Sequence, residues 1–335
     1  MKRFFLKSAK IGGILLALGA LTYWMGPRPS TPTFAVPSFA PAAHLQALED
    51  EIAATERAEP GIKPGCEATI IWADSSRKEK TKYTFLYLHG FGASRQEGAP
   101  VHEHLARLFG ANLFLARLDE HGVEEGDHNL LALTADSYVE SAERAYQIAQ
   151  QLGDSVVIIG TSAGGALGLF LAARHPEIKA LVTWSPCIRL FTDLSGVLAG
   201  PWGLQLARLM RGGEHNDWTF RKPEMVHYWT NHQRFEGITQ FATFLETAMV
   251  PTTFQKVHCP VFVGYYYKSE TEQDRVVSVE AMLEMLQQLG TSTDKKRAVA
   301  FPNAGDHVIA SAITSADWEG VERESAQFLQ SFLQL

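Results

Sequence analysis

Residues 155–165 read SVVIIGTSAGG, and this short stretch decides the fold class. Its four consecutive β-branched residues, 156–159, form an apolar run typical of a strand that is buried on both faces of a parallel sheet. The segment that follows, 163–174, is rich in alanine, leucine and glycine, as expected for a closely packed helix. Between them, residues 160–164 match the pattern G-x-S-x-G. The sequence therefore predicts a sharp strand-to-helix turn that presents Ser162.

This turn suits the chemistry of a nucleophilic serine. A serine hydroxyl is a weak nucleophile, so it must be held where a histidine can take its proton. Small residues two positions away, here Gly160 and Gly164, are needed because the turn brings the strand and helix backbones together. The start of the helix also favours negative charge that develops beside it. The alternative is a glycine-rich packing turn with an incidental serine, and the strand–turn–helix setting favours the nucleophile.

Outward from this turn, short apolar runs alternate with amphipathic stretches. Strands are predicted at 68–73, 83–89, 112–118, 155–159, 180–184, 260–267 and 297–301, and helices at 135–152, 163–174, 279–289 and 318–333. Such alternation indicates an α/β fold, in which a parallel sheet carries helices on both faces. The pattern lapses at about 186–257, where aromatic residues and helical stretches prevail. We expect a mostly helical cap to be inserted there.

Three further motifs accompany the turn at Ser162. Residues 86–92 read LYLHGFG, residues 274–277 read DRVV and residues 301–308 read FPNAGDHV. In this order the motifs resemble those of the α/β-hydrolase family, in particular its capped lipases, esterases and serine-aminopeptidase-like members, over about residues 65–335. The resemblance implies an α/β-hydrolase fold, with a mostly parallel sheet, helices on both faces and a helical cap inserted after strand 6 of the usual eight.

By this resemblance, Ser162 is the nucleophile, Asp274 the acid and His307 the base, in the chain order Ser, Asp, His of the family. His307 follows the strand predicted at 297–301, at the carboxyl end of the sheet, where ligands bind in such folds. His258 instead precedes a strand and would lie at the opposite end.

The loop that carries Asp274 offers other acids. Glu270 and Glu272 lie in the same loop, and Asp306 adjoins His307, so all three are alternatives. Asp274 is favoured because it resembles the family's D-x-V-V run, in which the valines anchor the loop and the carboxylate turns inward.

The segment 86–92 resembles the family's oxyanion segment. That resemblance implies that the backbone N–H groups of Phe91 and Ala163 face the oxyanion of a tetrahedral intermediate. His89 precedes the oxyanion position, and we expect it to brace the loop rather than to transfer protons.

The mechanism implied by the triad requires no cofactor and no metal. His102 and His104 lie two positions apart on a predicted helix and so point to different faces, which disfavours a metal site there. Residues 119–122, DEHG, only partly match the family's loop after the fourth strand. His121 and His128 are therefore expected to be loop residues.

The amino-terminal segment has the form of a secretory signal or signal anchor, because residues 1–10 are basic and 11–25 are apolar. A bilayer span usually needs about 20 residues, which tilt and interfacial side chains can offset. We expect an uncleaved membrane anchor at 1–28, with the enzyme on the extracytoplasmic side by the positive-inside rule. The alternatives are a signal cleaved near Ala20 and a helix packed on the domain.

The chain thus divides into this segment, a tether and lead-in at 29–64, and a hydrolase domain at 65–335 with a cap at about 186–257. The net charge is −7, and because the first 28 residues hold five basic and no acidic residues, the rest carries −12. An acidic body argues against nucleic acid as a partner, because phosphate binding needs clustered Lys and Arg. The cysteines are too scattered for a disulfide framework and are expected to be buried thiols: Cys66, Cys187 and Cys259.

The predicted function is a serine hydrolase that cleaves carboxylic esters through an acyl-enzyme. An apolar cap and a membrane anchor favour small-molecule substrates with apolar acyl groups, such as acylglycerols or lysophospholipids. One alternative is an aminopeptidase-type hydrolase with the same triad, for which Glu214 and Asp217 in the cap could hold a substrate amine. Haloperoxidases and carbon–carbon hydrolases share the fold, and a non-catalytic binding protein on a hydrolase scaffold is a further alternative.

Overall fold

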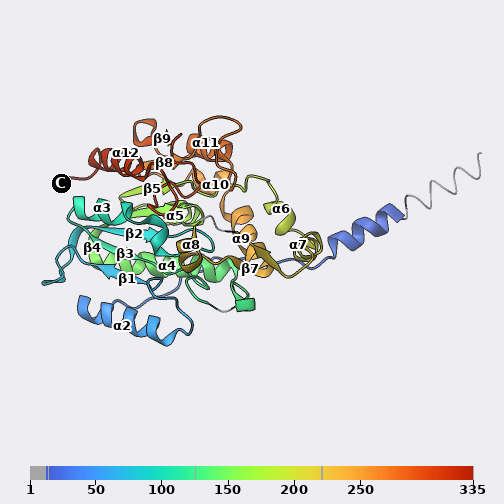
Figure 1. Ribbon diagram of the computed structural model, residues 1–335, viewed down its shortest axis with the longest axis horizontal. Coiled ribbons are helices and arrows are strands. Elements are labelled where there is room, and N and C mark those ends of the chain that lie inside the picture. Colours follow the sequence, from blue (N-terminus) through green and yellow to red (C-terminus); the bar gives the residue numbers. More distant parts are fainter. Residues whose placement is uncertain (1–12, 14, 125, 220–221, 335) are drawn as a thin grey trace, which may run out of the picture.

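A seven-stranded sheet forms the centre of the protein in the computed structural model, which describes residues 13, 15–124, 126–219 and 222–334 (Figure 1). The strand order is β1-β3-β2-β4-β5-β8-β9. β1 is antiparallel to β3, and the other neighbouring strands are parallel. The strands are β1 (Thr69–Ile71), β2 (Thr81–Leu88), β3 (Asn112–Leu115), β4 (Gly153–Thr161), β5 (Ala180–Trp184), β8 (Val261–Tyr265) and β9 (Lys296–Ala300).

Two apolar clusters cover the two faces of this sheet. Side chains alternate along a strand, so in β2 Leu86 faces one cluster and Phe85 the other. The helices on the Leu86 face are α4 (Ala135–Leu152), α5 (Ala163–Arg174) and α11 (Val279–Gln288), and those on the Phe85 face are α3 (Val101–Leu108) and α12 (Trp318–Gln330). The predicted α/β fold is confirmed.

The sheet has seven strands in the described residues, as many as the sequence patterns indicate, and not the family's usual eight, so the cap does not follow a sixth strand. The chain ahead of β1 forms helix α2 (Leu45–Ala58), and the cap follows β5, the fifth strand of the sheet. The cap lies beyond one end of the sheet (Figure 1). Between β5 and β8 it contains α6 (Ser195–Leu198), α7 (Gly203–Arg211), β6 (His215–Asp217), α8 (Pro223–Tyr228), β7 (His232–Arg234), α9 (Phe235–Ala248) and α10 (Pro251–Phe254).

The antiparallel pair β6–β7 is the part of the cap that sequence reasoning missed. Each strand has only three residues, and all six side chains are polar, so no apolar alternation marks them. They pair with Asn216 opposite Gln233 and with His215 opposite Arg234.

The predicted targeting segment lies partly outside the described residues. Residues 15–24 are helical and project from the cap side of the domain (Figure 1). The Trp202 indole donates a hydrogen bond to the Thr22 carbonyl at 3.2 Å, and the Trp202 N–H donates one to the Pro27 carbonyl at 2.8 Å. Within the part of the chain that the structure describes, no helix has the length and apolar character needed to cross a membrane.

The start of the predicted tether is held against the domain. Phe34 is buried, and its ring meets that of Phe170 in α5 edge-on with a centroid distance of 5.1 Å. The N–H of Phe39 donates to the Gln147 side chain in α4 at 3.1 Å. As predicted, the three cysteines are buried free thiols.

The approach of α5 to the end of β2 gives a test of this architecture. A Cβ at Gly164 would collide with the backbone carbonyl oxygen of Leu88, which cannot rotate away. We expect Gly164→Ala to lower the free energy of unfolding by about 3 kcal/mol, the upper end for overpacked sites.

Urea denaturation followed by circular dichroism measures this change. Gly213→Ala is the matched control, because a Cβ at Gly213 meets nothing within 4 Å. Equal stabilities of the two variants would contradict the described approach of helix and strand.

Candidate active site

Ser162 stands at the junction of β4 and α5 with φ 52° and ψ −115°, a conformation that residues other than glycine rarely adopt. The Ser162 N–H donates a hydrogen bond to the Trp184 carbonyl of β5 at 2.9 Å, which helps to hold the turn. Gly160 and Gly164 approach so closely that a Cβ at Gly160 would collide with the Gly164 carbonyl. The structure thus forms the strained turn predicted from the sequence pattern.

Asp274 and His307 lie together in the loops after β8 and β9. The Nδ1 of His307 and the Oδ2 of Asp274 are 2.6 Å apart, and the Asp274 side chain is fully buried. The other oxygen, Oδ1, accepts hydrogen bonds from the N–H groups of Val276 at 2.8 Å and Val277 at 3.1 Å. These bonds aim the carboxylate at the imidazole. A proton held on Nδ1 leaves Nε2 of His307 as the basic nitrogen.

Burial lowers the pKa of His307, but the neighbouring carboxylates, Asp274 first and then Glu97 and Asp306, together raise it more. The net result is a pKa above the ordinary value of 6.5. The imidazolium form is therefore stabilised, which would suit the predicted role of His307 as a base.

The alternative acids have other partners. Glu270 accepts a hydrogen bond from the Tyr267 hydroxyl at 2.8 Å, and Glu272 pairs with Lys268 at 2.8 Å. The Asp306 carboxylate accepts a hydrogen bond from the Val308 N–H at 3.0 Å.

The segment that follows β5 hydrogen-bonds both to the turn at Ser162 and to the loop that carries His307. The Cys187 N–H donates to the Ser162 carbonyl at 2.9 Å, and the Ser185 hydroxyl donates to the His307 carbonyl at 2.7 Å. Because β4, β5, β8 and β9 are parallel neighbours, their carboxyl ends share one edge of the sheet. The structure therefore brings Ser162, Asp274 and His307 to the same edge.

The predicted oxyanion segment, which follows β2, is braced by His89. The N–H of Leu118 donates to Nε2 of His89 at 3.1 Å, so the other nitrogen, Nδ1, carries the proton and donates to the Gly90 carbonyl at 2.9 Å. Burial lowers the pKa of His89 to about 3, which keeps the ring neutral. His89 thus has the bracing contacts that we expected.

The two predicted oxyanion donors border this segment. Phe91 directly follows Gly90, and its ring stacks on that of Phe241 in α9 with a centroid distance of 4.8 Å. Ala163 is the first residue of α5, where backbone N–H groups have no acceptor within the helix.

Glu97 is a buried acid in this region that sequence reasoning missed. Its Oε2 accepts a hydrogen bond from the Gly90 N–H at 2.5 Å. A Cβ placed on Gly90 would lie 2.8 Å from Glu97 Oε1 and 3.2 Å from the Ser162 Cβ, so the acid lies close to the serine. Burial raises the pKa of Glu97 to about 7, and its negative charge in turn raises the pKa of His307. No motif in the sequence marks this residue.

The cap covers this edge of the sheet. Trp229 follows α8 and packs with Ala93 and Val308, which border the oxyanion segment and the histidine loop. Ser162 keeps only 8% of its surface exposed. The aromatic residues of the cap therefore contribute both to its core and to the cover of the site.

Of the histidines set aside in the sequence, His102 and His104 have separate partners. The Nε2 of His102 is 2.9 Å from the Arg95 carbonyl oxygen, and the Nδ1 of His104 is 2.7 Å from Glu322. His121 is buried with Nδ1 2.6 Å from the Asp119 carbonyl oxygen. None of these contacts joins two of the three histidines.

Among solved structures, the chain is similar to one from a study of the metagenome-derived lipolytic enzymes LipS and LipT (TM-score 0.64, 19% identity, covering 81% of this chain and 99% of that one). It is also similar to a monoacylglycerol lipase from Paleococcus ferrophilus (TM-score 0.56, 16% identity, 80% and 100% covered). A third similar structure is a soluble variant of monoglyceride lipase from Saccharomyces cerevisiae (TM-score 0.57, 14% identity, 79% and 92% covered). At these identities the likeness shows the fold.

Sequence comparison gives a relative of the same kind. Over 118 residues the chain is 31% identical to a thermostable monoacylglycerol lipase from Bacillus sp. (strain H-257). The match covers 35% of this chain and 44% of that lipase, so it spans less than half of the relative. These relatives and structural neighbours are lipases, which are carboxylic ester hydrolases. Residues 85–320 match the profile described as "Alpha/beta hydrolase family", and since this is well over half of the chain, the protein belongs to the α/β-hydrolase family.

Proposed function

We propose that this protein hydrolyses carboxylic esters through an acyl-enzyme formed on Ser162. The observation that carries the proposal is the buried pair Asp274–His307, with 2.6 Å between Oδ2 and Nδ1, at the same sheet edge as the strained serine turn. The resemblance to named lipases supports an ester as the substrate.

In the proposed mechanism, Nε2 of His307 takes the proton of the Ser162 hydroxyl as the serine oxygen attacks the ester carbonyl carbon. Asp274 holds the imidazole in place and stabilises the imidazolium that forms. The N–H groups of Phe91 and Ala163 stabilise the oxyanion. In analogous enzymes, one such donor lowers the activation free energy by roughly 3–4 kcal/mol. His307 then protonates the leaving alkoxide, and water activated by the same residue hydrolyses the acyl-enzyme.

The proposed substrates are apolar acyl esters such as monoacylglycerols or lysophospholipids. Two of the similar structures and the related sequence are named as monoacylglycerol or monoglyceride lipases. The aromatic cover of the site, with Trp229 and the stacked pair Phe91–Phe241, also suits an apolar chain better than a charged one.

The enzyme is proposed to work at a lipid surface on the extracytoplasmic side, held there by its amino-terminal segment. The basic and apolar parts of residues 1–25 support this location. Residues 15–24 carry exposed apolar side chains, and so does the neighbouring helix α7, where Leu209 and Met210 are each 78% exposed. Exposed apolar side chains on the side of the molecule from which residues 15–24 project support a membrane contact there.

The aminopeptidase alternative is disfavoured by the contacts of its two candidate acids. Glu214 forms ion pairs with Arg234 at 2.6 Å and with Arg208 at 3.6 Å, and Asp217 is 2.5 Å from His232. Both acids are thus engaged with cap residues. We therefore favour ester over amide substrates.

Loss of the serine hydroxyl or the imidazole gives the first test. We expect Ser162→Ala and His307→Ala each to lower kcat by on the order of 10⁴ or more, with folding retained. Steady-state hydrolysis of a p-nitrophenyl ester measures this, and circular dichroism checks the fold. Near wild-type turnover of Asp274→Asn would show that the acid is elsewhere, and Glu272 would then be replaced.

A substrate series tests the reaction class. We expect p-nitrophenyl esters to be hydrolysed with an optimum of acyl chain length, and aminoacyl-p-nitroanilides to be poor substrates. Values of kcat/KM across the series measure this. Faster cleavage of the anilides would overturn the ester assignment.

The acid limb of the pH profile tests the role of Glu97. His307 must be neutral to accept a proton, so kcat/KM rises as pH increases through the pKa of His307. The negative charge of Glu97 raises that pKa, and Glu97→Gln should therefore shift the acid limb to lower pH. The matched control is Glu59→Gln, because Glu59 is exposed, and this change should not shift the acid limb of the pH profile. A shift to higher pH would contradict this electrostatic role.

A further inference from the structure

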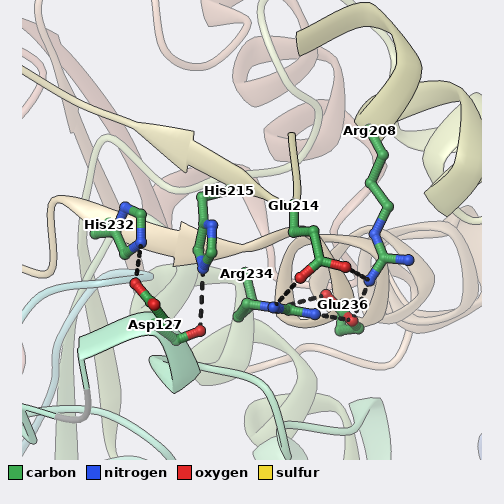
Figure 2. Close-up of polar contacts among 7 residues, drawn as sticks. All are labelled: Asp127, Arg208, Glu214, His215, His232, Arg234 and Glu236. Carbon is green, nitrogen blue, oxygen red and sulfur yellow. Dashed lines mark hydrogen bonds and ion pairs between the residues drawn. The ribbon is translucent and has the colours of Figure 1, made fainter. Parts of the chain in front are cut away.

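The hairpin β6–β7 of the cap has two different faces. Asn216 and Gln233 form the central pair and are buried, whereas their neighbours His215, Asp217, His232 and Arg234 alternate onto the opposite, outer face. The outer face meets η2 (Gly126–His128), a short helix of the hydrolase body. Figure 2 shows the charged and imidazole side chains gathered there.

Two histidines of the hairpin and one carboxylate of the body converge at this contact. One donor atom from each of His215, His232 and Asp127 lies within 4.8 Å of the others. The Nε2 of His232 is 3.2 Å from Asp127 Oδ1, close to the spacing of about 3.3 Å between donors of a tetrahedral zinc ion. The Nε2 of His215 is 3.0 Å from the Asp127 backbone carbonyl oxygen. Both rings turn these nitrogens toward Asp127 (Figure 2).

We propose that Asp127, His215 and His232 bind a divalent transition-metal ion, with Zn²⁺ the ion that suits this donor set. Two imidazole nitrogens and one carboxylate oxygen are common ligands of zinc, and a water completes the tetrahedron. The two rings are stacked with centroids 3.7 Å apart, so modest rotations about the side-chain bonds bring both Nε2 atoms onto one ion. His215 then exchanges its bond to the Asp127 carbonyl for the metal.

Asp217 supplies the support that a metal-binding histidine requires. Its Oδ1 lies 2.5 Å from Nδ1 of His232, so the proton of that ring is held on Nδ1 and Nε2 is left to bind the ion. A carboxylate behind a ligating histidine in this way fixes the ring and makes it a better donor. Together with Asp127, it provides two negative charges to balance a divalent cation.

Neighbouring cations are already neutralised. Arg234 pairs with Glu214 at 2.6 Å and with Glu236 at 2.7 Å, and Arg208 pairs with the same two glutamates (Figure 2). Two guanidinium groups thus face two carboxylates, and this network leaves little net positive charge to repel a metal ion.

An ion at this position would join the cap to the body beside the oxyanion segment. On the inner face of the hairpin, the Gln233 side chain packs against Gly92, and a Cβ placed on Gly92 would lie 2.2 Å from its Nε2. The Thr230 N–H donates to the Gly92 carbonyl at 2.7 Å, just ahead of β7. The ion would therefore hold the hairpin against the loop that follows Phe91. Its role is structural, and the triad needs no metal.

Calorimetric titration of Zn²⁺ into the metal-free, full-length protein tests the site. We expect one ion per chain, and at least about tenfold weaker binding for His215→Ala, His232→Ala and Asp127→Ala. Asp217→Asn, which alters only the support, should weaken binding by about tenfold. His227→Ala is the matched control, because His227 is an exposed cap histidine outside the cluster. Mg²⁺ should not compete, since it prefers oxygen donors.

Thermal unfolding gives a second readout that does not depend on hydrolysis. Zn²⁺ should raise the Tm of the wild type and of His227→Ala, but not that of His232→Ala. Retained hydrolysis in the presence of a chelator would keep this site separate from the proposed catalysis. Zn²⁺ binding that is unchanged in both histidine variants, or absent in the wild type, would overturn the proposal.

Discussion

The close approach of β4 and α5 at Ser162 is the constraint on which the rest of the site depends. It forces Ser162 into a positive φ and admits only glycine at positions 160 and 164. Strain of this kind persists only where the surroundings determine the backbone fully. Here the Ser162 N–H donates to the Trp184 carbonyl, and the Ser162 carbonyl accepts from the Cys187 N–H. The conformation of the turn is therefore held by hydrogen bonds to β5 and the segment after it, as well as by the packing of α5.

The same sheet edge places the other groups. Asp274 and His307 come from loops that follow adjacent parallel strands, so their meeting is a consequence of the topology. Glu97 adds a second buried carboxylate, which both shapes the oxyanion segment through the Gly90 N–H and acts on the charge of His307. The cap then closes over this edge through Trp229 and Phe241.

Much of the fold could be predicted from the sequence because its central strands are continuous apolar runs and its helices have strong periodicity. Helices 135–152 and 163–174 and the strand 180–184 have the predicted bounds. The hairpin β6–β7 could not be predicted, since its six polar residues are defined by pairing rather than by pattern. Asp127 lies 88 residues before His215, and no motif links them. Glu97 was likewise hidden, because its importance comes from burial beside Gly90.

The central claim, that Ser162 is an activated nucleophile, is tested most directly by covalent labelling. A fluorophosphonate probe should react with the native protein, and mass spectrometry of the digested product should find the adduct on the peptide that contains Ser162. Ser162→Ala should remain unlabelled under the same conditions. Absence of labelling in the wild type, or equal labelling of Ser162→Ala, would contradict the account and favour a non-catalytic role for this hydrolase scaffold.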